Sequence, residues 1–299
     1  MTSPTAHHHR FDVSMAPVDT NATMEDHLEA AMADQPDAIR ATLAPIAAGG
    51  KRTRARMVRL ASRAGTVAPP PHRLEALAAS VELLHLATLV HDDVIDGDLE
   101  RRGHPTLFAS FDEGTSIVAG DRIIGSAFQL TSSISGTCAA GMARCLMALC
   151  DGQQHEELCV QAGEWTADDY WRSVDGKTAS LFTFALVAGA ELGQADATTL
   201  GALQDFGMAY GRAYQLADDL VDLPSTPPGR QLVRALAPSQ SSEPFGLGGS
   251  LSPLADLSAH LFGDALAAAS LLSGEPAEVF TALAEAGRAQ AHRLAEELG

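Results

Sequence analysis

The stretch that decides the fold of this chain is LHLATLVHDDVID, residues 84–96. It is an apolar run that ends in three carboxylates, Asp92, Asp93 and Asp96. Side chains four residues apart lie one above the other on the same face of an α-helix. Asp92 and Asp96 are therefore expected to point the same way, close enough to share a divalent cation.

A second acidic cluster, DDLVD at residues 218–222, repeats this spacing at the end of another apolar run. Carboxylates at the open end of an apolar bundle are costly unless they are paired or bind a metal ion. Hard oxygen ligands suit Mg²⁺, which usually takes one or two carboxylates together with substrate phosphates. One such cluster is equally typical of a solvated helix end, but two with matched apolar lead-ins predict two walls of one metal-filled pocket.

The composition favours helices. Hydrophobic residues make up 46% of the 299 residues, and aromatic residues only 5%. Ala and Leu dominate and β-branched runs are short, which favours helices packed on helices over sheets. Without a fixed repeat or a convincing domain boundary, the sequence predicts an all-α, single-domain bundle of about ten helices.

The formal net charge of −18 argues against nucleic acid or an anionic membrane as the main partner. We find no signal peptide and no apolar stretch approaching the ~20 residues that span a bilayer. The sequence therefore predicts a soluble, cytoplasmic protein without stable membrane insertion. The cysteines form no CxxC pair and are expected to be reduced core residues. Cys150, His155 and Cys159 are conceivable zinc ligands, but ordinary helical positions are favoured.

Apolar periodicity predicts where the helices lie. Residues 1–22 are expected to form a flexible arm and residues 23–299 the folded domain. Within that domain, residues 224–253 are rich in Pro, Ser and Gly and are expected to form an irregular loop or flap. Helices are expected at residues 24–48 with a break near 36, 51–64, 72–95, 121–130, 137–162, 166–192, 194–220, 254–272 and 276–298.

Basic residues lie beside these acidic ones. The segment GGKRTR, residues 49–54, places three cations at a predicted helix N-terminus, where backbone N–H groups and the helix dipole also favour anions. Arg101 and Arg102 follow the first acidic cluster directly. In a chain with only 20 Lys and Arg, this placement indicates a second, metal-free phosphate site, with ordinary surface charge as the alternative.

The segment DGKTASLF, residues 175–182, contains Gly-Lys-Thr, as the end of a P-loop does. The first glycine of that motif is missing at the required spacing and no strand is expected before it, so we reject nucleotide binding. Lys177 and Thr178 remain candidates for binding phosphate at a break in a helix.

Taken together, these motifs closely resemble those of the trans-isoprenyl diphosphate synthases, the polyprenyl synthetase family. The resemblance runs from about Gly49 to Asp222. Its elements stand in the family's order: GGKRTR (49–54), DDVID (92–96) with RRG (101–103), GD (120–121), Tyr170 with KT (177–178), and YQLADDLVD (214–222).

The resemblance implies the isoprenoid synthase fold, a helical bundle around a deep apolar cavity, usually as a homodimer. It also implies a prenyltransferase that joins isopentenyl diphosphate to an allylic diphosphate, head to tail, with release of pyrophosphate. Mg²⁺ is the implied cofactor, with about three ions per site stabilising charge on the leaving pyrophosphate. No side-chain nucleophile is needed for this chemistry.

Motif matching gives each site residue an implied role. The metal ligands are Asp92, Asp96, Asp218 and Asp222, with Asp93 in support. The catalytic set is Asp92, Asp93, Asp96, Lys177 and Asp218. The residues that contact the allylic substrate are Arg101, Lys177, Thr178 and Gln215. Those that bind isopentenyl diphosphate are Lys51, Arg54, His85 and Arg102.

Two positions depart from the family pattern. Ala55 stands where a proline usually follows the basic motif. Residues 223–254 contain no lysine, although the family normally carries two there, in a loop that helps to close the site. Arg230 and Arg234 are the charges available, and arginine is not a neutral replacement for lysine.

The helix before Asp92 also predicts product length, because in this family its preceding turns line the cavity floor. Ala87, with Thr88 beside it, stands where a bulky aromatic residue would stop the growing chain at about fifteen carbons. Alanine leaves the tunnel open, so a product of roughly twenty carbons or more is expected. Leu84 is among the deeper residues that can cap it.

Two other functions remain open. The unusual segment after Asp222 is compatible with a class I terpene cyclase, a lyase that ionises an allylic diphosphate without a second substrate. Such an enzyme has no use for Lys51, Arg54, His85 and Arg102. The other is a regulatory subunit of a heteromeric synthase, against which the two intact acidic clusters argue.

Overall fold

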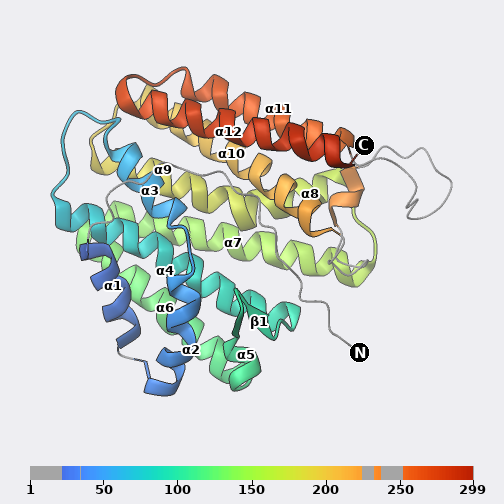
Figure 1. Cartoon of the computed structure of the whole chain (residues 1–299). Coiled ribbons are helices and arrows are strands. Elements are labelled where there is room, and N and C mark those ends of the chain that lie inside the picture. The colour runs from blue at the N-terminus through green and yellow to red at the C-terminus, as the bar shows by residue number, and fades with distance from the viewer. Residues whose placement is uncertain (1–21, 34, 224–231, 237–251, 299) are drawn as a thin grey trace. The chain divides into compact units, whose positions relative to one another are not determined.

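The computed structural model describes residues 22–33, 35–223, 232–236 and 252–298 (Figure 1). The predicted arm therefore lies outside the described residues except for Ala22, which begins the first helix. Most of the predicted flap at residues 224–253 also lies outside them. Its described parts are a 3₁₀-helix at Leu232–Leu236 and the first residues of a helix that begins at Ser252.

The described residues are almost entirely helical, which confirms the all-α prediction. The elements are α1 (Ala22–Ala33), α2 (Asp37–Ala48), α3 (Thr53–Ser62), α4 (Pro71–Asp96), β1 (Glu100–Arg101), β2 (His104–Pro105), α5 (Leu107–Ser110), α6 (Glu113–Ile134), α7 (Gly136–Ala162), α8 (Ala167–Val174), the π-helix η1 (Asp175–Ala179), α9 (Ser180–Leu192), α10 (Ala197–Asp222), the 3₁₀-helix η3 (Leu232–Leu236), α11 (Ser252–Ala269) and α12 (Gly274–Leu298).

One helix begins well before its predicted start. Helix α6 begins at Glu113, whereas the sequence pattern placed its start at Asp121. The Asp112 side chain accepts a hydrogen bond from the Thr115 backbone N–H at 2.6 Å, and an aspartate in this position is a strong N-cap. The glycines of this segment obscured the cap, because they indicated a loop instead.

The chain divides into two compact units. The N-terminal unit comprises Ala16–Leu146 and Phe184–Asp196. The C-terminal unit comprises residues 147–183 and the described residues within 197–298. The single-domain organisation expected from the sequence stays a prediction.

Helix α4 is the core of the N-terminal unit and packs against α1, α3 and α6. Pro71 stands in its first turn, where the missing N–H of proline has no intrahelical partner to lose. It ends at Gly97, whose φ of 70° is a left-handed conformation that glycine adopts without strain. Leu77, Leu83 and Leu84 have no exposed surface, which explains why this helix is apolar on nearly all sides.

The same helix is long and apolar enough to cross a membrane by length and composition alone. This corrects the expectation that no stretch approaches that length. In the structure, 72% of its most apolar window is buried inside the protein, as in the core helix of a soluble protein. The composition of α4 is therefore explained by its place in the core.

Glycines allow α3 and α9 to approach closely within the N-terminal unit. A Cβ added at Gly189 would lie 2.4 Å from the Val58 carbonyl oxygen, and one at Gly193 would lie 2.1 Å from that of Ser62. No side chain fits at such distances, so larger residues at these positions would push the helices apart.

The C-terminal unit is built on α10, which packs against α11, while α11 packs against α12. Its core contains the rings of Phe206, Tyr210, Phe262 and Phe280, with Phe206 and Phe280 centroids 4.9 Å apart. A Cβ on Gly211 would lie 2.5 Å from Ala179 Cα, so this glycine lets η1 lie directly on α10. These contacts position the C-terminal end of α10, where the second acidic cluster stands.

Candidate active site

The predicted site residues divide between the two units. Those of the N-terminal unit are Lys51, Arg54, Leu84, His85, Ala87, Thr88, Asp92, Asp93, Asp96, Arg101 and Arg102. Those of the C-terminal unit are Lys177, Thr178, Gln215, Asp218 and Asp222.

At the end of α4 the three carboxylates have different surroundings. Asp92 is half-buried and Asp96 is exposed, whereas Asp93 is buried. This is the outcome expected of helical spacing, because positions i and i+4 share a face that position i+1 does not. Asp92 and Asp96 therefore present hard oxygen donors at the surface of this unit, a donor set that suits Mg²⁺.

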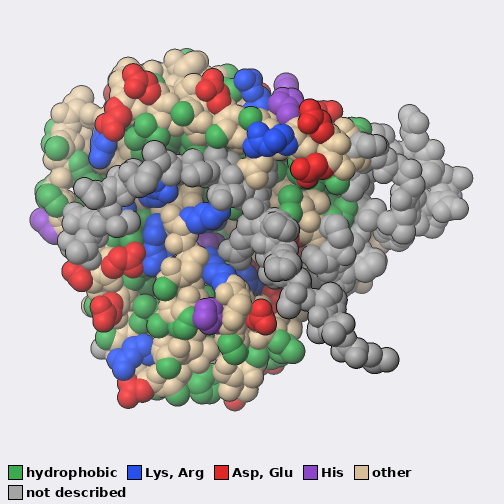
Figure 2. Space-filling model, viewed as in Figure 1, with side chains coloured by type: hydrophobic (Ala, Val, Ile, Leu, Met, Phe, Trp, Pro, Cys, Tyr) green, Lys and Arg blue, Asp and Glu red, His purple; other side chains and the backbone are tan. Residues whose placement is uncertain are grey.

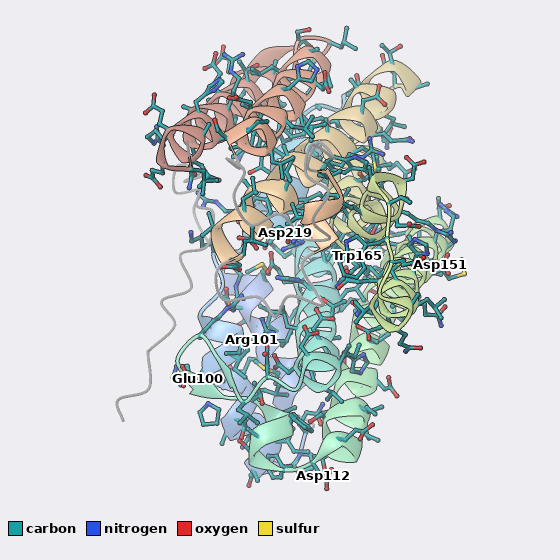
Figure 3. All side chains as sticks on the ribbon, turned by 90° about the vertical axis from the view of Figure 1, so that its right-hand side faces the viewer. Glu100, Arg101, Asp112, Asp151, Trp165 and Asp219 are labelled. Carbon is teal, nitrogen blue, oxygen red and sulfur yellow. The ribbon has the colours of Figure 1, made fainter. Side chains whose placement is uncertain are left out.

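Asp93 binds an arginine of the strand pair that follows α4. Arg101 Nε donates a hydrogen bond to Asp93, and Arg101 Nη2 donates to Asp98 at 3.2 Å. Figure 3 labels Arg101 on this strand pair, next to Glu100. Burial raises the pKa of Asp93 to about 6, although the Arg101 guanidinium acts in the opposite direction. Asp93 therefore holds Arg101 in place, a role that the sequence did not reveal.

The pKa of Asp93 predicts a pH dependence of stability in the metal-free protein. Because the folded-state pKa is about 6 and the unfolded-state pKa is about 3.9, the folded protein binds more protons between those values, and stability falls as pH rises through that window. In the wild-type protein, we expect the free energy of unfolding to fall by on the order of 2 kcal/mol between about pH 4 and pH 7 because of Asp93. We expect this fall to be absent in Asp93→Asn. Urea unfolding in EDTA at several pH values measures this.

The matched control is Asp205→Asn, which changes an exposed aspartate of α10. Its stability should follow the wild-type pH dependence. An Asp93→Asn protein with the wild-type slope would show that Asp93 is not the titrating group.

Arg102 connects the same strand pair to the loop between α2 and α3. Its Nη1 donates to the Ile46 carbonyl oxygen at 2.6 Å, and a Cβ on Gly49 would lie 3.0 Å from its Cδ. Arg52 and Arg102 have φ values of 54° and 56°, a conformation that only a few per cent of non-glycine residues adopt. Strained backbone of this kind clusters at functional sites.

Figure 2 shows Lys and Arg side chains gathered on one face, beside the position of α3 in Figure 1. Near the start of α3, Lys51 is exposed, while Arg52, Arg54 and Arg102 are half-buried. Arg52 binds Glu25 at 3.0 and 2.9 Å and the Ala47 carbonyl oxygen at 2.8 Å, so its charge is already engaged within the unit. We call Lys51, Arg54 and Arg102 the basic loop cluster.

Ala55, which stands where the resemblance leads us to expect a proline, has a specific contact. Its backbone N–H donates to Glu82 Oε1 at 2.9 Å, and both residues are buried. A proline at this position has no N–H to donate. Glu82 therefore fixes the first turn of α3, and with it the basic loop cluster. No local sequence signal indicated this role for Glu82, which stands within an apolar helical run.

In the C-terminal unit, the second acidic cluster is held by hydrogen bonds around Asp219. Tyr170 Oη and Gln215 Nε2 each donate to Asp219 at 2.7 Å, and Thr178 Oγ1 donates to Gln215 Oε1 at 2.6 Å. Figure 3 labels Asp219 near the end of α10. Asp218 and Asp222 stand on either side of it, both half-buried. Gln215 and Thr178, predicted to contact substrate, are thus part of the support of this acidic cluster.

Burial raises the pKa of Asp219 to about 7, while the hydrogen bonds from Tyr170 and Gln215 act to lower it. The neighbouring Asp218 carboxylate raises it further. The pKa of Tyr170 is raised well above its usual value, first by burial and then by Asp219. Tyr170 therefore keeps its proton and acts as a donor to the acidic cluster.

Lys177 lies on the π-helix, a form of helix that is rare and frequent at functional sites. Its Nζ donates to Glu156 Oε2 at 3.0 Å, and Ser173 Oγ donates to the same oxygen at 2.6 Å. Arg212 binds Asp175, the first residue of the π-helix, at 2.5 and 2.6 Å. Glu156 thus holds the side chain of Lys177, and the ion pair of Arg212 with Asp175 holds the start of the π-helix on which Lys177 lies.

The residues predicted to set product length lie on α4. Leu84 and Ala87 have no exposed surface. Thr88 is half-buried, and its hydroxyl donates to the carbonyl oxygen of His85, also half-buried, at 2.8 Å. Ala87 therefore stands in a packed environment in which a larger side chain must displace its neighbours.

The sequence of this chain is similar to those of known proteins. Residues 36–230 match the family model described as polyprenyl synthetase. The chain is 40% identical over 152 residues to geranylgeranyl diphosphate synthase of Mycobacterium tuberculosis, covering 49% of this chain and 43% of that protein. It is 34% identical over 178 residues to octaprenyl diphosphate synthase of Escherichia coli, covering 59% of this chain and 54% of that protein.

A solved structure shares the fold. It is a polyprenyl synthase from Caulobacter crescentus complexed with calcium and isoprenyl diphosphate, with a TM-score of 0.74 and 28% identity. The similarity covers 91% of this chain and 94% of that one. In sequence, the chain spans about half the length of the two curated relatives named above.

Proposed function

The chain belongs to the polyprenyl synthetase family, and on that premise we propose that it joins isopentenyl diphosphate to an allylic diphosphate, head to tail, with release of pyrophosphate. The product is a trans-polyprenyl diphosphate of roughly twenty carbons or more, since the small Ala87 stands where a bulky aromatic residue would stop the growing chain. The enzyme works as a homodimer in the cytoplasm, without insertion into a membrane and without a nucleic acid partner.

One observation carries this proposal: a single strand pair connects an acidic helix end to a basic loop within the N-terminal unit. Arg101 binds Asp93 of the acidic end, while Arg102, a member of the basic loop cluster, binds the backbone of α2. An acidic group suits a diphosphate that brings divalent cations, and a basic group suits one that binds without them. Two diphosphates of different binding mode are what a condensing synthase requires.

The carboxylates of Asp92, Asp96, Asp218 and Asp222 fit Mg²⁺ by their chemistry, since all are hard oxygen donors near the ends of helices. When bound there, Mg²⁺ supplies positive charge to the diphosphate that becomes the leaving group. Asp93 and Asp219 support these ligands from within, the first through Arg101 and the second through its own hydrogen bonds.

The chain's own cations perform the remaining electrostatic work. Arg101 and Lys177, each held by a carboxylate, donate to the allylic diphosphate as its bond to carbon breaks. Lys51, Arg54, His85 and Arg102 hold isopentenyl diphosphate, with its double bond directed at the allylic carbon. That double bond forms the new carbon–carbon bond, and the released pyrophosphate takes the proton that is lost. Apolar side chains of α4 exclude water from the allylic carbocation that forms when the bond between carbon and the diphosphate breaks.

The experiment that tests the proposal incubates purified protein with Mg²⁺, labelled isopentenyl diphosphate and each allylic primer in turn, followed by mass analysis. Label should enter prenyl diphosphates that grow by one isoprene unit per cycle. A terpene cyclase would instead consume the primer and leave the labelled substrate unused, an outcome that the lysine-free segment after Asp222 makes worth testing. A regulatory subunit would be inactive until a partner chain is added.

Product length gives a specific prediction at Ala87. We expect Ala87→Phe to shift the main product to a shorter prenyl chain, because the ring occupies space below the growing end. Overpacking a buried position also costs about 1–3 kcal/mol of stability. Product mass is measured beside thermal unfolding, with Ala87→Ser as the control of similar size. An unchanged product from folded Ala87→Phe would show that this position does not limit chain length.

A further inference from the structure

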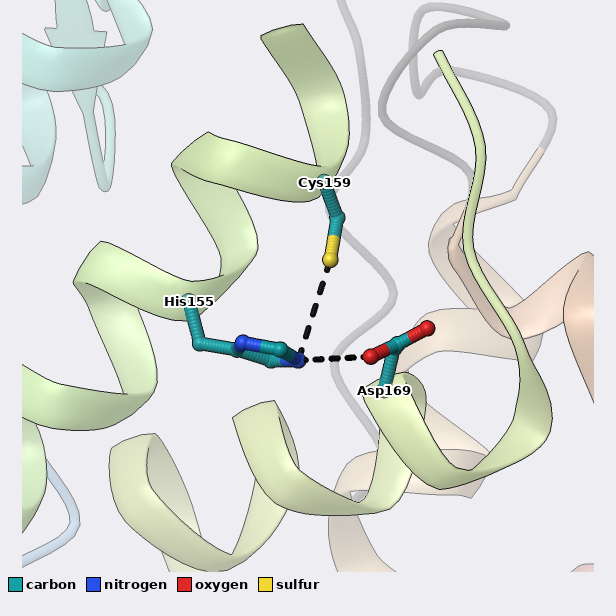
Figure 4. A group of neighbouring side chains, drawn as sticks. All are labelled: His155, Cys159 and Asp169. Carbon is teal, nitrogen blue, oxygen red and sulfur yellow. Dashed lines mark hydrogen bonds and ion pairs between the residues drawn. The ribbon is translucent and has the colours of Figure 1, made fainter. Parts of the chain in front are cut away.

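A cluster of three potential metal ligands lies in the C-terminal unit, where α7 meets α8 (Figure 4). His155 and Cys159 stand one turn apart on α7, and Asp169 stands in the first turn of α8. His155 Nε2 lies 2.9 Å from Asp169 Oδ1 and 3.7 Å from Cys159 Sγ. The ligand atoms of all three residues lie within 4.8 Å of one another.

The geometry excludes a catalytic triad. In a Cys-His-Asp triad the thiol and the carboxylate bind opposite nitrogens of the imidazole ring. Here both contact the same nitrogen, Nε2. The ring nitrogen is thus the common neighbour of the other two donor atoms, and three donor atoms within 4.8 Å of one another are typical of a metal site.

The distances also fit a tetrahedral ion. With Zn–N and Zn–O bonds of about 2.0–2.2 Å and a Zn–S bond of about 2.3 Å, ligand atoms in a tetrahedral site lie roughly 3.3–3.7 Å apart. Two of the observed separations, 2.9 and 3.7 Å, bracket that range, and the third, between Cys159 Sγ and the Asp169 carboxylate, is at most 4.8 Å.

The carboxylate is already held in place for this role. Asp169 Oδ2 accepts hydrogen bonds from the Thr166 N–H and from the Thr166 hydroxyl, both at 2.8 Å, which leaves Oδ1 directed at His155. These hydrogen bonds lower the pKa of Asp169, so it is ionised at neutral pH. Supporting contacts that orient a ligand in this way commonly accompany metal sites.

Cys159 is the buried member of the cluster. It is 7% exposed, and its pKa is raised by burial and by the Asp169 carboxylate. A neutral thiol 3.7 Å from the ring nitrogen of His155 makes only a weak hydrogen bond. A bound cation would instead take the thiolate as a ligand and neutralise the carboxylate.

We propose that His155, Cys159 and Asp169 bind one Zn²⁺ ion, with the fourth coordination position open to water. The mixed nitrogen, sulfur and oxygen donor set favours a borderline-soft ion over Mg²⁺. The ion ties α7 to α8 immediately before Tyr170, the residue that donates to Asp219. This site is independent of the acidic clusters and of the proposed condensation.

Co²⁺ is the probe that tests the proposal, because a thiolate ligand gives Co²⁺ a charge-transfer absorption band in the near ultraviolet. Carboxylate clusters cannot give that band, and neither can the His7–His9 segment. We expect the full chain, titrated with Co²⁺ in excess Mg²⁺, to develop the band with one equivalent and to lose it on addition of Zn²⁺.

Variants identify the ligands. Cys159→Ser should abolish the band, and His155→Gln and Asp169→Asn should weaken Co²⁺ binding at least about 10-fold, as loss of a ligand or its support does. The matched control is Cys150→Ser, which changes an exposed cysteine of the same helix and should keep the band. Circular dichroism establishes that each variant is folded.

Two results would overturn the proposal. One is the absence of a thiolate band in the wild-type chain. The other is a band that survives in folded Cys159→Ser and disappears in Cys150→Ser. Because none of these measurements uses prenyl substrates, their outcome does not depend on the proposed enzyme activity.

Discussion

Replacing Asp92 or Asp218 by alanine should lower the rate of prenyl transfer by about 1,000-fold, which corresponds to about 4 kcal/mol of transition-state stabilisation. Each carboxylate is half-buried near the C-terminal end of an apolar helix, where it can hold a cation on the allylic diphosphate. Without the carboxylate, the charge that develops on the leaving pyrophosphate has less compensation. Steady-state rates with saturating Mg²⁺ and both substrates measure the effect.

The control for these variants is Asp205→Ala, an exposed aspartate on α10 upstream of Asp218. It removes the same charge from the same helix and should leave the rate unchanged. Near-normal rates in both Asp92→Ala and Asp218→Ala would refute the assignment of the two acidic clusters as metal ligands. Loss of activity in Asp205→Ala would instead point to a general effect of charge on the protein.

The largest effect on stability is expected at a buried ion pair between α3 and α4. Arg59 and Glu75 form two hydrogen bonds of 2.9 and 2.5 Å, and their side chains are 6% and 3% exposed. Breaking a buried pair leaves the other charge uncompensated and costs about 3–5 kcal/mol. We therefore expect Arg59→Ala and Glu75→Ala each to lower the free energy of unfolding by that amount, measured by urea denaturation.

The double variant Arg59→Met with Glu75→Leu separates the charge effect from packing. Replacing both partners with apolar residues of similar volume is often neutral or stabilising, so the double variant should be more stable than either single one. If the two single variants unfold like the wild type, the pair contributes nothing. If the double variant is the least stable, packing around the pair matters more than its charge.

Helical spacing was enough to predict the surface positions of Asp92 and Asp96, because it depends only on the geometry of one helix. The apolar run before Asp92 also identified α4 as the central helix of the N-terminal unit. The start of α6 was missed because the Asp112 cap stands in a glycine-containing segment. In that segment the glycines indicate a loop and Asp112 indicates a helix start, and the structure follows Asp112.

Contacts between distant residues could not be predicted in the same way. Tyr170 and Asp219 are far apart in sequence, and only the packing of α8 near α10 brings them to 2.7 Å. The same is true of Glu82 and the Ala55 N–H. His155 and Cys159 were visible as neighbours on one helix, with Cys150 as a conceivable third ligand, but the sequence favoured ordinary helical positions for all three. The turn that brings Asp169 beside them follows from the capping box at Thr166.

The stoichiometry of the reaction tests the central claim most directly. Purified protein is given Mg²⁺, an allylic diphosphate and labelled isopentenyl diphosphate, and the pyrophosphate released is compared with the isopentenyl diphosphate consumed. A condensing synthase releases one pyrophosphate for each isopentenyl diphosphate that it adds, and that ratio is the predicted result. Pyrophosphate release without consumption of isopentenyl diphosphate would contradict the proposed function.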